Sequence, residues 1–122
     1  MIDIEMYVCV KNSIVMCHAY PHALEKVSFL RNQHRHVFHV QTCIEVHHGN
    51  REIEFFDLQD KVQSILDMFK EDNNGSVFNC EDITLNVSHT LDTLYHGTRK
   101  MNIEVSEDNE NFVRILCDKN KF

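Results

Sequence analysis

The chain has 122 residues, of which 43% are hydrophobic and 25% are charged, values that are ordinary for one globular domain. The net charge of −7 and the lack of clustered lysine and arginine exclude a nucleic-acid-binding surface of the usual kind. No apolar run reaches the roughly 18 residues that a membrane helix needs. The N-terminus carries acid where a signal peptide carries base, so we expect a mature cytoplasmic protein that begins here, with one domain over residues 1–122.

The cysteine and histidine contents give the first clues to chemistry. Five cysteines are widely spaced and form no Cys-x-x-Cys pair. In a cytosolic chain they are expected to be small buried hydrophobic side chains rather than a disulfide framework. Nine histidines are an unusually high number for this length, and most of them lie between His18 and His48. Histidine chemistry, and metal binding above all, is therefore the first hypothesis to consider.

The N-terminal third predicts strands. Apolar and polar residues alternate over residues 2–10, and a second apolar stretch runs from Ile14 to His18. The pattern leaves open whether these stretches form a hairpin or one long bulged strand. Residues 19–33 hold the only proline and predict a loop, with a short helix near Leu24 to Leu30.

The clearest long strand is expected from His34 to His47, because its even positions are mostly apolar. Gly49-Asn50 then predicts a two-residue turn, after which Arg51 to Phe56 returns as the partner strand. Asp57 is expected to cap the helix that follows.

The second half predicts two helices and two strands. The first helix ends before Asn73, and the second runs from Asn79 to a stop at Gly97. Strands follow over 100–106 and 111–117. The residues expected on the buried faces of the two helices recur at helical spacing: Leu58, Val62, Ile65, Leu66 and Phe69, then Ile83, Val87, Leu91 and Leu94.

This order of strand, strand, helix, helix, strand, strand predicts an α+β fold with a four-stranded antiparallel sheet and both helices on one face. Such a sheet has two long edges, and unprotected edges tend to pair with another chain. We therefore expect a homo-oligomer.

Three histidines form the candidate metal site. His34 and His36 are two residues apart in a strand, so their side chains point the same way, roughly 6–7 Å apart. His18 ends another strand and is the best-placed third ligand, with His22 as the reserve. Three histidines with a position left over are typical of catalytic zinc, so we predict Zn²⁺.

Several motifs around these histidines resemble the 6-pyruvoyltetrahydropterin and 6-carboxytetrahydropterin synthases. The motifs are, in chain order, His18-Ala-Tyr-Pro-His22, His34-Arg-His36-Val-Phe38, Arg51-Glu-Ile-Glu-Phe-Phe-Asp-Leu58, Cys80-Glu-Asp-Ile83 and Ile103-Glu-Val-Ser-Glu107. The resemblance covers most of the chain in the right order. It implies the tunnelling fold, with ββααββ topology, zinc on three histidines, and sites at the subunit interfaces of a homo-oligomer.

The chain also departs from this family. The family's catalytic cysteine lies four residues before the first histidine of the His-x-His motif, where this chain has Leu30. Of the catalytic Asp-His pair after the first helix, at most Asp67 is present. The resemblance thus implies that the metal site is kept and that the thiol-based acid–base apparatus is lost. A general base would have to be another residue, with Asp67, His22 and His39 as candidates.

Glu107 is the candidate ligand-binding residue. Strand alternation places it with the apolar positions Met101, Ile103 and Val105, where an unpaired carboxylate is costly. In the family the matching glutamate binds the aminopyrimidinone edge of a pterin. The expected ligand is therefore a pterin-, purine- or deazapurine-like molecule. Three hypotheses stay open: a zinc-dependent enzyme, a binding module without turnover, and an inhibitor or assembly protein with a structural metal.

Overall fold

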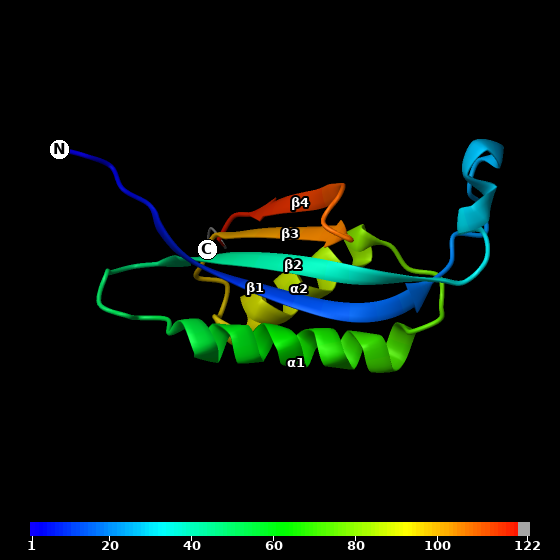
Figure 1. Cartoon of the computed structure of the whole chain (residues 1–122). Coiled ribbons are helices and arrows are strands. Elements are labelled where there is room, and N and C mark those ends of the chain that lie inside the picture. Colours follow the sequence, from blue (N-terminus) through cyan, green and yellow to red (C-terminus); the bar gives the residue numbers. More distant parts are fainter. Residues whose placement is uncertain (120–122) are drawn as a thin grey trace.

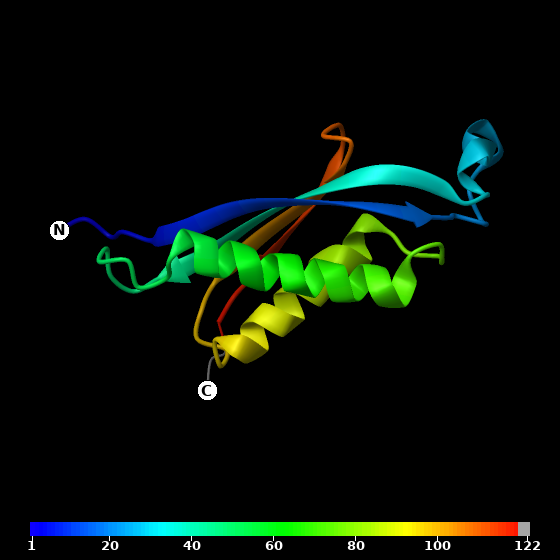
Figure 2. The same ribbon diagram turned by 60° about the horizontal axis from the view of Figure 1, so that its bottom comes forward.

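The structure is a computed structural model that describes residues 1–119; the last three residues of the predicted domain, 120–122, lie outside the described residues. It is an α+β arrangement in which an antiparallel sheet of order β1-β2-β3-β4 carries α1 and α2 on one face (Figures 1 and 2), as the sequence predicts. The elements are β1 (Met6–His18), β2 (His34–Val46), α1 (Phe55–Asn73), α2 (Cys80–Leu94), β3 (Met101–Glu107) and β4 (Phe112–Cys117). A short 3-10 helix, η1 (Glu25–Leu30), occupies the loop between β1 and β2.

The first two strands form one long ribbon, which resolves the alternative left open above. β1 is a single strand, and each of its 13 residues has one partner in β2, from Met6 opposite Val46 to His18 opposite His34. No extra residue interrupts this register, so the strand has no bulge. Even-numbered residues of both strands face the helices, because the buried positions alternate along each strand.

The expected return strand from Arg51 to Phe56 is wrong. β2 already pairs with β1 on one side and with β3 on the other, so β2 has no free edge for this segment to join. It forms a loop that leads into α1 instead, and Arg51 adopts a left-handed φ of 51° within it. The helix cap also differs from the prediction. Glu54, not Asp57, is the N-cap, and its carboxylate accepts from the backbone N–H groups of Phe56 and Asp57.

The core lies between the sheet and the two helices. α1 packs against β1, and α2 packs against β3 and β4. The predicted buried face of α1 is confirmed in full, as are the first three positions of α2. Leu94 is an exception, since it is 49% exposed at the last residue of its helix. Phe38 is fully buried and links this core to the histidine end of the sheet.

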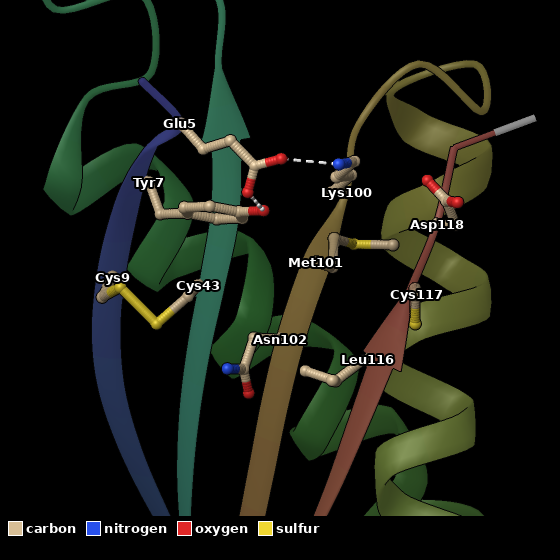
Figure 3. A pocket seen from close by; sticks show the side chains of 10 residues that line it. All are labelled: Glu5, Tyr7, Cys9, Cys43, Lys100, Met101, Asn102, Leu116, Cys117 and Asp118. Atoms are coloured by element: carbon tan, nitrogen blue, oxygen red, sulfur yellow. Dashed lines mark hydrogen bonds and ion pairs between the residues drawn. A yellow bond between two sulfur atoms is a disulfide. The ribbon is translucent and has the colours of Figure 1, made fainter. Parts of the chain in front are cut away.

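The expectation that all cysteines are free is wrong. Cys9 and Cys43 lie directly opposite each other on β1 and β2, with Cα atoms 4.0 Å apart, and are joined by a disulfide (Figure 3). Such closeness is typical of the narrow, non-hydrogen-bonded pairs of an antiparallel ladder. Cys17, Cys80 and Cys117 are free thiols. Across residues 1–119, no helix is both long and apolar enough to cross a membrane.

Candidate metal centre

The three histidines predicted as ligands meet at one end of the β1–β2 ribbon. His18 lies directly opposite His34, and His36 follows on the same face of β2. The ring centroids are 4.5 Å apart for His18 and His34, 4.9 Å for His34 and His36, and 5.4 Å for His18 and His36. One ligand nitrogen from each ring lies within 4.8 Å of the other two. The cluster therefore offers three nitrogens to a single ion.

Each of the three rings is oriented by a hydrogen bond from Nδ1. Nδ1 of His18 donates to the backbone oxygen of Phe78 at 2.8 Å, and Nδ1 of His34 donates to a backbone oxygen two residues earlier, also at 2.8 Å. Nδ1 of His36 donates to Oδ2 of Asp108 at 2.6 Å. Because these oxygens can only accept, the proton of each neutral ring lies on Nδ1 and leaves the lone pair on Nε2. Ligands are commonly oriented in this way in metal sites.

Two of the Nε2 atoms are buried without a hydrogen bond, those of His18 and His36. His18 is only 6% exposed, and burial lowers the pKa of its imidazole, so the ring is neutral at pH 7. An unsatisfied buried polar atom costs roughly 1–3 kcal/mol. A cation among the three nitrogens would remove that cost, and imidazole nitrogen is a preferred zinc donor. The residues present therefore fit Zn²⁺.

The loop between α1 and α2 supports the back of the site. The N–H of Gly75 donates to the backbone oxygen of Cys17 at 2.8 Å, so the loop runs beside the end of β1. Gly75 has a left-handed φ of 85°, a backbone conformation that favours glycine. This path brings the buried ring of Phe78 to 5.0 Å from that of His18.

Asp108 is a site residue that the sequence did not reveal. It follows β3 in a turn, with φ of 53°, and its Oδ1 accepts from the N–H of Val37 at 3.0 Å. Its own N–H donates to the oxygen of Val37 at 2.8 Å, so its backbone is fixed against β2. The hydrogen bond from His36 lowers the pKa of Asp108, which is therefore ionised at neutral pH. Nothing in the sequence distinguishes it from its acidic neighbours.

Glu107 lies beside the histidines on the face that alternation predicts. Its Oε1 is 3.2 Å from Nε2 of His18, and its Oε2 is 3.5 Å from Nε2 of His36. The side chain is 34% exposed, so it is also accessible to a small molecule. The thiol of Cys80 lies 4.0 Å from Oε1 of Glu107. Burial, followed by the charge of Glu107, raises the pKa of Cys80 to about 12, so this thiol is neutral at pH 7.

A pocket of about 390 Å³ adjoins His18, His34 and Glu107. His22 lines it as an exposed residue, which places one of the three candidate bases next to the histidines. Leu30 lines it as well. This is the residue that stands where the synthases that the chain resembles carry their catalytic cysteine.

The other two candidate bases lie elsewhere in the chain. Asp67 is exposed on α1, where its carboxylate accepts a hydrogen bond from Gln63 at 3.1 Å. His39 alternates onto the sheet face away from His36 and the helices, and it lines a separate pocket of about 420 Å³. The fold thus brings His22 and Glu107 to the histidine cluster but leaves Asp67 and His39 outside it within one chain.

Fold and site together define an α+β protein with a candidate three-histidine metal centre. No protein-family model matches the chain, and no curated protein matches its sequence. The resemblance to the tetrahydropterin synthases therefore rests on the motifs described above, and the activity that it implies is a proposal.

Proposed function

We propose that this is a zinc-binding protein of the tunnelling-fold type that acts on or binds a pterin-, purine- or deazapurine-like small molecule. In this proposal it does so without the cysteine-dependent mechanism of the synthases that it resembles. The observation that carries the proposal is the convergence of three Nε2 atoms from rings whose Nδ1 atoms are all engaged. A surface cluster of histidines would not need three separate acceptors to orient it.

Each residue of the site has its own role in this proposal. His18, His34 and His36 would hold the ion, and three protein ligands are one fewer than the four that zinc usually takes. When bound, zinc supplies a Lewis acid that polarises a carbonyl or hydroxyl oxygen of the ligand. Glu107 would accept N–H groups from the ligand, and His22 would move a proton at the edge of the pocket.

The thiol chemistry of the synthases is not part of this proposal. Leu30 cannot take or give a proton, and Cys80 stays a protonated thiol at pH 7, which cannot accept a proton, because burial raises its pKa to about 12. We expect no useful turnover of 7,8-dihydroneopterin triphosphate to either family product, measured by mass spectrometry. Turnover comparable to that of a true synthase would contradict this part of the proposal.

A second candidate function is a catalytically inactive binding, inhibitor or assembly module with a structural zinc. It is favoured by the position of Asp67 and His39, since only His22 then remains as a candidate base beside the cluster. Product analysis of the zinc-loaded protein with a ligand found by screening separates the two functions. A ligand that binds and is released unchanged would support the second.

We also propose a homo-oligomer in the cytoplasm, with sites near subunit interfaces. Support comes from β1 and β4, which form the two edges of the sheet, and from the exposed apolar residues Phe112 and Leu116 on β4. Light scattering at micromolar concentration should give a multiple of the 14.4 kDa chain mass. A mass near 14.4 kDa would contradict oligomerisation.

The central test is metal content together with ligand binding. The purified chain should hold close to one zinc per chain by elemental analysis, and a thermal-shift screen of pterins, purines and deazapurines should then find a stabilising ligand. Zinc without any such ligand would leave only the structural-metal function. Absence of zinc after incubation with an excess of the metal would refute the proposal as a whole.

A further inference from the structure

The pocket beside the metal centre has an unusual charge. Three carboxylates line it, those of Glu81, Asp82 and Glu107, and apolar side chains including Phe78 form much of the rest. His18, which is more than nine-tenths buried, lines the same pocket, and its Nε2 makes no hydrogen bond. Because Nε2 of His18 lies 3.2 Å from Oε1 of Glu107, the pocket opens directly beside the candidate metal centre and is more than an acidic surface.

A second hollow, of about 260 Å³, is also lined by acidic residues. Glu81 and Glu107 line both hollows, so the two adjoin, and the second also has Asp108 and Glu110 on its walls. Among the residues that the structure describes, no lysine or arginine lines either hollow. The carboxylates on the walls of these two hollows therefore have no lysine or arginine among the described lining residues to balance them.

The two arginines closest in sequence to the histidine ligands do not change this. Arg31 donates from its guanidinium to Glu25 at 3.0 Å and to the backbone oxygen of Ala23 at 3.0 Å. Arg35 alternates onto the sheet face opposite to His34 and His36. A phosphate in the pocket would thus meet carboxylates without a neutralising guanidinium.

We propose that this pocket selects a neutral or cationic ligand and rejects phosphate esters of the same ring system. This inference rests on the proposed function and names the charge class of its ligand. A zinc ion on three neutral imidazoles adds two positive charges, but three carboxylates line the pocket itself. A phosphate group carries up to two further negative charges, and repulsion between charges a few ångströms apart weakens binding even when water screens it. N–H groups of a neutral or cationic ring are attracted by the same carboxylates.

The test compares matched ligands on the zinc-loaded full chain. Guanosine and guanosine 5′-monophosphate share one ring and differ in the phosphate, and their affinities are measured by isothermal titration calorimetry. We expect the monophosphate to bind at least about tenfold more weakly than guanosine. The difference should shrink as salt is raised, because salt screens repulsion between charges.

Two charge-reversal variants make the test specific to this pocket. Glu81→Lys places a cation on a wall shared by both hollows, so it should bring the affinity of the monophosphate close to that of guanosine. Glu71→Lys makes the same charge change at an exposed position on α1 that lines neither hollow, and should leave the ratio unchanged. An equal effect of both variants would mean that net charge, not the pocket, sets the preference, and would overturn the inference.

The remaining outcomes separate this inference from the function on which it rests. Equal or tighter binding of the monophosphate by the unchanged protein overturns the inference while the proposed function stands. Failure of the chain to hold zinc overturns the proposed function first. Zinc binding with no affinity for guanosine, for its monophosphate or for any pterin, purine or deazapurine of the thermal-shift screen contradicts the ligand class of both.

Discussion

Two cross-strand pairs of the β1–β2 ribbon, one near each of its ends, differ in their surroundings. Near the start of β1, Cys9 and Cys43 are joined by a disulfide. At the end of β1, His18 and His34 are opposed in the same way but make no bond to each other. One pair is complete within the chain. The other pair, together with His36, forms the candidate metal site.

The polar groups around each pair reinforce this contrast. At the disulfide end, Nζ of Lys100 donates to Glu5 at 2.6 Å and the hydroxyl of Tyr7 donates to the same carboxylate at 3.2 Å (Figure 3). At the histidine end, Nε2 of His18 and Nε2 of His36 make no hydrogen bond, and both face the carboxylate of Glu107 at 3.2 and 3.5 Å. Buried polar atoms are normally satisfied. One end of the ribbon is closed by a covalent bond within the chain, whereas the other brings three imidazole nitrogens within 4.8 Å of one another, which supports the metal site that we propose.

The largest expected effect is the loss of metal when a ligand is removed. His18→Ala, His34→Ala and His36→Ala should each lower the zinc content from near one per chain to near zero. Zinc present at about 1,000 times its dissociation constant stabilises a folded protein by about 4 kcal/mol, so thermal unfolding should lose its dependence on zinc. Elemental analysis and calorimetry measure the two effects.

The control for these variants is His89→Ala, because His89 is exposed on α2 and lines none of the pockets beside the cluster. It should keep its zinc. His22→Ala tests the pocket edge in the same series, and partial loss of zinc there would indicate that this residue supports the ligands. Full metal content in all three ligand variants would show that the histidine end is not a metal site.

The next effect concerns the disulfide end. The bond between Cys9 and Cys43 joins residues 34 apart in sequence, for which constraint of the unfolded chain gives about 3–4 kcal/mol of stability. Cys9→Ala combined with Cys43→Ala should lower the free energy of unfolding by about that amount, measured by denaturant titration, and zinc content should not change. Loss of zinc in the double variant would break the contrast between the two ends. Cys17→Ser, at a free thiol, is the matched control and should cost far less.

The alternation of side chains made much of this architecture predictable from the sequence. The even positions of β2 and the i, i+4, i+7 spacing of α1 place the same residues inward in the sequence and in the structure. The three histidines were predictable for the same reason, since His34 and His36 share a face wherever the strand pairs. The prediction of a return strand from Arg51 was wrong because it rested on a Gly-Asn turn, which is a local signal. Which strand pairs with β2 is decided by contacts distant in sequence.

The disulfide and the contact of Asp108 with His36 were not predicted, because both depend on the register of strand pairing. Cys9 meets Cys43 only because β1 runs unbroken as far as His18 opposite His34, and the sequence left open whether residues 2–18 form a hairpin or one long bulged strand. Asp108 reaches His36 only because Glu107 pairs with Phe38, which brings the turn after β3 over β2. A shift of one residue in the strand register would give each of these side chains a different partner.

Glu107→Gln should sharpen the contrast by separating ligand binding from metal binding. A carboxylate can accept two N–H groups in charge-assisted hydrogen bonds worth about 1.5–3 kcal/mol, so the variant should bind the ligand from the screen roughly ten- to a hundredfold more weakly. Zinc content should stay near that of the unchanged protein, because the three imidazoles remain. Calorimetry with the zinc-loaded variant measures the first effect, and unchanged affinity would remove Glu107 from the binding site.

The smallest expected effect comes from Asp108→Asn, which removes the charge behind His36 and replaces one of the two accepting oxygens by an NH2 group. The amide oxygen of asparagine can still accept from Val37, so the turn after β3 should survive. The NH2 group then faces Nδ1 of His36, so the variant loses both the hydrogen bond from Nδ1–H and the negative charge that makes Nε2 a better donor to the metal. Outer partners of this kind are worth about 10–100-fold in metal affinity, so competition with a chelator should show a loss in that range. Asp67→Asn makes the same chemical change on the exposed face of α1 and should leave zinc affinity unchanged. If the two variants bound zinc equally well, the hydrogen bond between His36 and Asp108 would serve the fold alone, and the histidine end would resemble the disulfide end after all.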